Sequence, residues 1–143
     1  MSMPTVELVL HFLRKLDYLR LATAISRLIC TTLPDSDLEK DFVDHVELAV
    51  SEACTNAIRH TKDADAVATV AIRFAVHEDQ LVVEVRDQGE GFDLEEAPLP
   101  DFDQHPEGGY GLLIIRTVMD EVCYTRGEEY NSLTMKKYFK KPQ

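Results

Sequence analysis

The spacing of apolar residues divides the chain into predicted strands and helices. Apolar and polar residues alternate in the predicted strands, which cover residues 5–13, 67–77, 81–86, 122–126 and 133–139. Apolar residues three and four positions apart predict helices over residues 18–31, 37–60 and 111–120. Asp17 is the expected N-cap of the first helix, because a carboxylate oxygen can accept hydrogen bonds from first-turn N–H groups.

The order of these elements predicts an α/β (α+β) two-layer sandwich. Short turns at residues 78–80 and 127–132 join two pairs of strands into hairpins. We therefore expect a mostly antiparallel, mixed sheet with the helices on one face. The 143 residues contain no internal repeat and no linker, so residues 1–143 are expected to form a single domain.

Residues 87–110 break this regularity. They show no period, carry eight acidic side chains and contain no lysine or arginine. Structureless stretches beyond about 12 to 15 residues usually serve as lids or binding loops. A solvated acidic excursion is the alternative interpretation of this segment.

Charge narrows the classes of function. Lysine and arginine total 15 against 26 aspartates and glutamates, a formal charge of −11, which disfavours direct binding to nucleic acid or to an anionic membrane. No secretory signal or membrane span is visible, and we expect a cytoplasmic protein. A basic cluster near the C-terminus is interpreted as solvation and edge protection, and it comprises Lys136, Lys137, Lys140 and Lys141.

Cysteines and histidines do not suggest a metal site. Cys30, Cys54 and Cys123 are odd in number and lie in apolar segments, so they are interpreted as small buried residues in a reducing compartment. The five histidines form no cluster with them, which disfavours zinc. Any metal is expected to be a hard cation.

A polar stripe runs along the second predicted helix. Glu52, Asn56 and His60 are four residues apart and therefore share one helix face. The amide oxygen of Asn56 suits Mg²⁺, and the carboxylate of Glu52 can accept a proton from a water or a hydroxyl. Taken alone the pair is weak, because polar residues at this spacing are common on exposed helix faces.

A second motif follows the strand at residues 81–86. Asp87 comes first, and Gly89 and Gly91 follow it. A buried carboxylate at this point selects a ligand with an N–H donor, such as the amino group of adenine. Glycines let the backbone approach a flat base closely, since they carry no Cβ.

A third motif opens the third predicted helix. Gly109 and Gly111 flank Tyr110 at the start of residues 111–120. The unpaired N–H groups and the dipole of a helix N-terminus form an anion site, which suits phosphate. Either glycine pair alone is also consistent with a plain turn or helix start, and the spacing is not that of a Walker P-loop.

The order of the three motifs is more specific than any one of them. It resembles the nucleotide-binding boxes of the Bergerat-fold (GHKL superfamily) ATPases. The spelling of residues 51–60 and of residues 119–122 looks most like the anti-sigma-factor serine-protein kinases of bacterial partner-switching systems. This resemblance covers about residues 5 to 140.

The resemblance implies a role for each motif residue. Glu52 would be the catalytic base or water-orienting carboxylate, Asn56 would hold Mg²⁺, and Asp87 would read adenine. Residues 92–108 would close over the nucleotide as an ATP lid. The remaining residues implied to contact ATP or ADP are Gly89 and Gly91 under the base, and Gly109, Tyr110, Gly111 and Leu112 around the phosphates.

The resemblance also implies a function. The protein would be an ATP-binding anti-sigma factor that phosphorylates a Ser or Thr of an anti-anti-sigma (STAS-type) antagonist and sequesters a sigma factor. It would act as a homodimer, and the face of the first helix and a sheet edge would be used in homodimer and sigma-factor contacts. The lack of lysine and arginine in residues 87–110 favours an alternative, a nucleotide-gated binding module without kinase activity. The catalytic part of a sensor histidine kinase is a poorer expectation, since no helical segment bearing a histidine precedes the domain.

Overall fold

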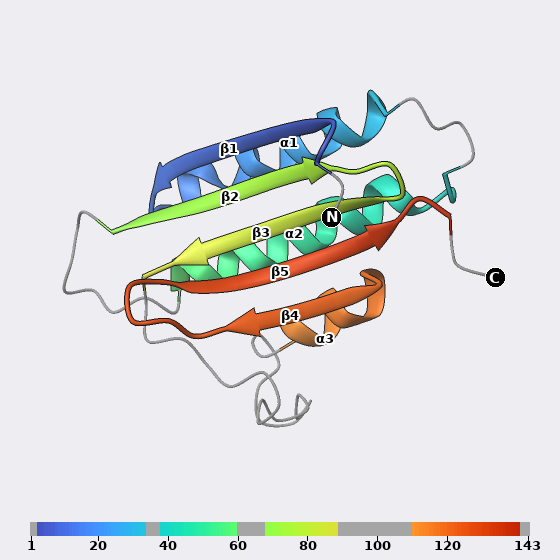
Figure 1. Ribbon diagram of the computed structural model, residues 1–143. Coiled ribbons are helices and arrows are strands. Elements are labelled where there is room, and N and C mark those ends of the chain that lie inside the picture. Colours follow the sequence, from blue (N-terminus) through green and yellow to red (C-terminus); the bar gives the residue numbers. More distant parts are fainter. Residues whose placement is uncertain (1–2, 34–37, 60–67, 89–109, 141–143) are drawn as a thin grey trace.

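Two layers make up the structure, a computed structural model that describes residues 3–33, 38–59, 68–88 and 110–140. One layer is a five-stranded sheet with the strand order β1-β2-β3-β5-β4, and the helices cover one of its faces (Figure 1). The strands are β1 (Val6–Leu13), β2 (Thr69–Val76), β3 (Gln80–Asp87), β4 (Glu121–Thr125) and β5 (Asn131–Tyr138). The helices are α1 (Leu19–Thr31), α2 (Phe42–Arg59) and α3 (Gly111–Val118). This arrangement confirms the predicted order of elements and the two-layer α/β class.

All neighbouring strands among the described residues pair antiparallel, so the expectation of a mixed sheet is wrong. β4 runs in the same direction as β3 (Figure 1). The hairpin that follows β4 inserts β5 between them, and β5 opposes both neighbours. A parallel pair is thereby avoided, although α3 connects two strands of the same direction.

The core lies between the sheet and α2. Strand residues at every second position face the helices, as the alternation predicts. Ile72 pairs with Val85, and Phe74 pairs with Val83, and all four side chains are buried. The stripe predicted for α2 faces this surface through buried residues that include Phe42, Val46, Ala49, Val50, Ala53 and Ala57. Because apolar side chains of both the sheet and α2 are buried in this interface, the rotation of α2 about its axis is fixed. The direction of its polar stripe is fixed with it.

The starts of the first two helices differ from the prediction. Asp17 is not an N-cap, because it lies within a 3-10 turn, Leu16–Tyr18, that leads directly into α1. The cap position is Tyr18, which makes no side-chain capping hydrogen bond. α2 begins at Phe42, and residues 38–41 before it are not helical; Asp37 lies outside the described residues.

Two predictions about buried and exposed side chains are wrong. Cys123 is exposed, because it lies on the open face of the edge strand β4, whereas Cys30 and Cys54 are buried as expected. Lys137 is buried although it belongs to the basic cluster interpreted as solvated. β5 is an inner strand, and Lys137 occupies the face that packs against the helices.

No helix in the described part of the chain is both long and apolar enough to cross a membrane.

Candidate functional site

The first and third sequence motifs meet where α3 begins. A Cβ atom added to Gly111 would lie 3.0 Å from Nδ2 of Asn56 and 3.0 Å from Oε2 of Glu52. Both polar residues are half-buried on α2, one turn apart, as the spacing predicts. His60, the third member of the stripe, lies outside the described residues. Side chains about 55 residues away in sequence therefore contact the first residue of α3.

The first turn of α3 begins at this contact. Tyr110 occupies the N-cap position, and its carbonyl accepts a hydrogen bond from the N–H of Ile114 at 2.9 Å. The N–H groups of a first helical turn have no partner within the helix and carry the positive end of its dipole. Tyr110, Gly111 and Leu112 are half-buried. The helix start is therefore a suitable anion site beside two oxygen-bearing side chains.

Asp87 is the last residue of β3 and lies on the face of the sheet that the helices cover. Its Oδ1 accepts a hydrogen bond from Nδ2 of Asn131 at 3.1 Å, and Asn131 is only 2% exposed. The strand pairing places the two residues directly opposite each other. Figure 1 shows that β3 and α2 end at the same end of the molecule. The carboxylate is thus held in a defined orientation at the end of the molecule that carries Asn56.

The donor set suits a magnesium nucleotide. Glu52 and Asn56 offer a carboxylate and an amide oxygen, which are hard ligands of the kind that Mg²⁺ prefers. Gly111 brings the positive helix end against the same two side chains, where phosphate oxygens would be favoured. Residues that would hold both a hard cation and an anion therefore lie within one small region.

Part of the predicted site lies outside the described residues. This applies to Gly89, Gly91, Gly109 and the lid at residues 92–108. Their expected contacts with base and phosphate stay predictions.

Asn131 contacts a predicted site residue, although no sequence motif singles it out. Asn131 shares a buried register with Leu133 and Met135, so a polar residue at a core position was the available signal. Its partner, Asp87, follows only from the pairing of β3 with β5, which the sequence does not specify.

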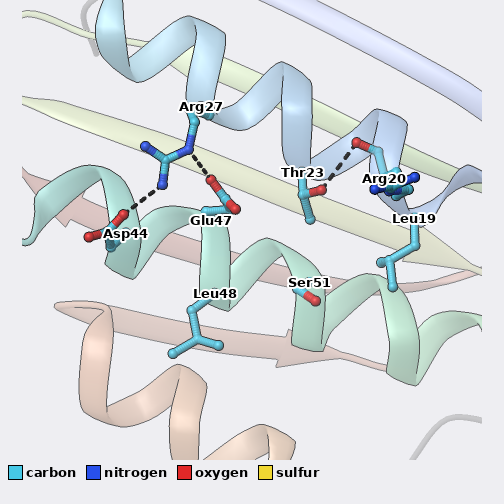
Figure 2. Close-up of a pocket in the computed structure, with 8 residues that line it drawn as sticks. All are labelled: Leu19, Arg20, Thr23, Arg27, Asp44, Glu47, Leu48 and Ser51. Atoms are coloured by element: carbon cyan, nitrogen blue, oxygen red, sulfur yellow. Dashed lines mark hydrogen bonds and ion pairs between the residues drawn. The ribbon is translucent and has the colours of Figure 1, made fainter.

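A groove between α1 and α2 lies apart from this site (Figure 2). Its volume is about 550 Å³, and it is lined by Leu19, Arg20, Thr23, Arg27, Asp44, Glu47, Leu48 and Ser51. Arg27 donates to Asp44 Oδ1 at 2.6 Å and also to Glu47. Hydrogen bonds to Asp44 and Glu47 raise the pKa of the Arg27 guanidinium. These exposed ion pairs connect the two helices, and Glu52 and Asn56 do not line the groove.

The fold and this arrangement agree with a known class of protein. The sequence matches the histidine kinase-like ATPase domain family over residues 15–137, and the chain belongs to that family. The resemblance to GHKL-type domains is confirmed.

Curated relatives are serine-protein kinases named RsbW. The chain is 43% identical over 90 residues to RsbW of Bacillus subtilis, a match covering 57% of this chain and 56% of that protein. It is 35% identical over 112 residues to RsbW of Staphylococcus aureus, covering 72% of this chain and 70% of that protein. The chain spans about half the length of the Bacillus relatives that it matches.

Solved structures share the fold. The RsbU and RsbW domains of a Mycobacterium tuberculosis protein superpose with a TM-score of 0.65 at 18% identity, covering 97% of this chain and 34% of that one. The SiaB-SiaC complex of Pseudomonas aeruginosa gives a TM-score of 0.60 at 12% identity, covering 92% and 89%. A histidine kinase domain from Erythrobacter litoralis gives 0.56 at 24% identity, covering 86% and 60%.

Proposed function

We propose that this chain is an ATP-dependent protein serine/threonine kinase and anti-sigma factor. It phosphorylates a Ser or Thr of an anti-anti-sigma (STAS-type) antagonist and sequesters a sigma factor when that antagonist is phosphorylated. Relatives named serine-protein kinase RsbW, at 35% and 43% identity, support this assignment. All the named relatives are bacterial, and we propose the bacterial cytoplasm as the location, since sigma factors act there.

One observation carries the proposal. Gly111 at the start of α3 lies against Glu52 and Asn56 of α2. Phosphoryl transfer depends mainly on positioning and on charge neutralisation, and this contact puts a carboxylate, an amide oxygen and a helix N-terminus within reach of one phosphate chain.

Each residue has a distinct part in the proposed reaction. Asn56 would hold Mg²⁺ through its amide oxygen, and the bound cation would neutralise charge on the phosphate oxygens. Glu52 would accept the proton of the attacking Ser or Thr hydroxyl. Asp87 would accept a hydrogen bond from the adenine amino group, while the N–H groups at Gly111 and Leu112 would bind phosphate.

The test is transfer of labelled phosphate. We expect the purified chain, given Mg²⁺ and γ-labelled ATP, to label a candidate anti-anti-sigma protein and not that protein with its acceptor Ser or Thr changed to Ala. An unlabelled partner after long incubation, with ATP bound, would contradict the kinase assignment.

A nucleotide-gated binding module is the second candidate. Residues 87–110 contain no lysine or arginine, so that segment supplies no cation for a developing phosphoryl charge. Sigma-factor binding that depends on nucleotide, without any labelled partner, would favour this module over the kinase.

A homodimer is part of the proposal, and the edge strand β1 supports it. β1 pairs with β2 over its whole length, and its other edge has no strand neighbour in the described sheet. Val6, Val9 and Leu13 are 54%, 44% and 39% exposed. A long edge strand with exposed apolar side chains promotes association with another chain, as a homodimer requires.

We expect light scattering to report a dimer. Val9→Lys should give a monomer and Leu113→Lys, on the exposed face of α3, should not; a monomeric wild type would contradict this part.

A further inference from the structure

A lysine is buried at the end of α3 opposite to Gly111. Lys137 is 4% exposed and lies on the face of β5 that packs against the helices. Its Nζ donates a hydrogen bond to the carbonyl of Val118 at 2.6 Å and lies 5.6 Å from the centroid of the Phe42 ring. Burying a charged group is costly unless polar partners compensate it. The contacts of this lysine therefore call for a physical explanation.

Two of the contacts of Lys137 lie at helix ends. Val118 is the last residue of α3, where carbonyls have no partner within the helix. A cation there caps the helix and opposes the negative end of its dipole. Phe42 is the first residue of α2. Lys137 thus joins β5, the end of α3 and the beginning of α2.

The opposite end of α3 makes the contact of the proposed nucleotide site. Gly111 and Val118 are seven residues apart, or about 10 Å at the helical rise of ~1.5 Å per residue. Gly111 touches Glu52 and Asn56, which belong to the same helix α2 that begins at Phe42. One short helix is therefore fixed to α2 at both ends, so a shift at Val118 would move Gly111 by a similar amount.

We infer that Lys137 is a positioning residue for phosphate binding. By holding the carbonyl of Val118, it sets the position of α3 along its own axis and hence the placement of the Gly111 N–H group beside Asn56. An apolar residue at position 137 would carry no donor for the Val118 carbonyl, so this link between β5 and the end of α3 depends on the lysine. The inferred effect on phosphate binding rests on the proposed nucleotide binding. The effect on the position of α3 involves only residues of this chain.

The test compares Lys137→Met with the neighbouring Lys136→Met. Both remove one ammonium group from β5, but Lys136 lies on the opposite face of the strand. Two hydrogen bonds between Asp120 and β5 stay available in both variants, from the Asp120 N–H to the Lys136 carbonyl at 2.9 Å and from the Tyr138 N–H to Oδ2 of Asp120 at 2.7 Å. We therefore expect both to fold, which urea denaturation checks. Lys137→Arg keeps a cationic donor and serves as the conservative variant.

We expect Lys137→Met to bind ADP and ATP about tenfold more weakly than wild type, and Lys136→Met to bind them normally. Adenosine lacks phosphate, so its affinity, followed by NMR titration, should be equal in all variants. Lys137→Arg should recover part of the ADP affinity. Normal ADP binding by Lys137→Met, or an equal loss of adenosine and ADP, would overturn the positioning role.

A measurement without nucleotide separates this inference from the proposed function. In the wild type we expect a nuclear Overhauser effect between the Gly111 α-protons and the Asn56 side-chain amide, and we expect it to be lost in Lys137→Met only. If wild type binds no nucleotide but this signal behaves as expected, the proposed function fails and the positioning of α3 by Lys137 stands. An unchanged signal in Lys137→Met overturns the positioning.

Discussion

Gly111 lies so close to Asn56 that a Cβ atom added to it would be 3.0 Å from the Nδ2 atom of the amide. Ordinary contacts between heavy atoms lie at about 3.5 to 4.0 Å. The absence of a side chain at the start of α3 therefore lets the helix approach α2 more closely than any other residue would. This close approach brings the first and third sequence motifs together.

Gly111→Ala should weaken nucleotide binding without unfolding the protein. The added methyl group must displace the side chains of Asn56 and Glu52 by a few tenths of an ångström, which moves the proposed metal ligand and the proposed base away from the phosphates. Gly111 is the first residue of α3, so the methyl group disturbs the helix start and leaves the rest of the helix intact. We expect calorimetry to show ADP and Mg·ATP affinities lower by about tenfold, roughly 1.4 kcal/mol.

Leu113→Ala is the matched control for that variant. It also places alanine in the first turn of α3, but Leu113 is exposed. Its nucleotide affinity should equal that of the wild type. Full affinity in Gly111→Ala would show that the contact between α3 and Asn56 has no part in binding.

Glu52→Gln should separate binding from transfer. Glutamine keeps the size and a polar oxygen of the side chain next to Gly111, so nucleotide affinity should change little. It cannot accept the hydroxyl proton, and general-base contributions are typically about 10²- to 10⁴-fold. Labelled-phosphate transfer to the partner should therefore fall by about that factor.

Glu47→Gln provides the comparison on the same helix. Glu47 pairs with Arg27 across the groove between α1 and α2, away from Gly111. Its loss should leave the transfer rate unchanged. Wild-type transfer by Glu52→Gln would remove the carboxylate from the catalytic step.

The order of elements could be predicted from the sequence because each element has its own local period. The polar face shared by Glu52 and Asn56 followed in the same way from their spacing. Their contact with Gly111 has no local signal, since it joins elements about 55 residues apart. Only the order of motifs, compared with a known family, indicated that these elements meet.

Lys137 shows why the rest could not be predicted. It follows Leu133 and Met135 in the alternation, which places it on the buried face, yet its charge and its lysine neighbours favoured a solvated interpretation. Its partner is the carbonyl of Val118, which has no partner within the helix because α3 ends there. A side chain whose partner is a backbone atom of a distant helix leaves no pattern in the sequence.

The three thiols should differ sharply in reactivity. Burial raises the pKa of Cys30 and of Cys54 to about 12, whereas Cys123 is exposed. Thiolates are the reactive species, so Ellman's reagent should modify one thiol in the folded protein and all three in urea. Cys123→Ser should abolish the fast reaction. Rapid modification of Cys54 in the folded state would contradict its burial.

The same two thiols predict how stability depends on pH. Their pKa values are higher in the folded protein than the ordinary value of 9.0, so the unfolded chain releases these protons first as the pH rises. Their contribution is complete below pH 9 and decreases between pH 9 and about 12. Urea midpoints should therefore fall more steeply above pH 9 in wild type than in Cys30→Ala.

Asp87→Asn should weaken adenine binding more than its small change in shape suggests. Asn131 donates a hydrogen bond to Oδ1 of Asp87, so asparagine at position 87 has one oxygen to serve two donors, Asn131 and the adenine amino group. If it faces Asn131, its own NH₂ group opposes the adenine donor. If it faces adenine, the buried NH₂ of Asn131 loses its acceptor.

Either orientation costs a hydrogen bond to a charged group, about 1.5 to 3 kcal/mol, so ADP affinity measured by calorimetry should fall by about 10- to 150-fold. Adenosine should lose affinity by the same factor, because the change acts on the base and not on phosphate. Adenosine therefore distinguishes the two variants, because Gly111→Ala should weaken ADP binding but leave adenosine binding unchanged. In the Asp87→Asn, Asn131→Asp double variant, the new amide can donate its NH₂ group to the carboxylate at position 131 and present its oxygen to the adenine amino group. It should recover much of the lost affinity, and an affinity no better than that of Asp87→Asn would show that the pairing of the two positions has no part in adenine binding.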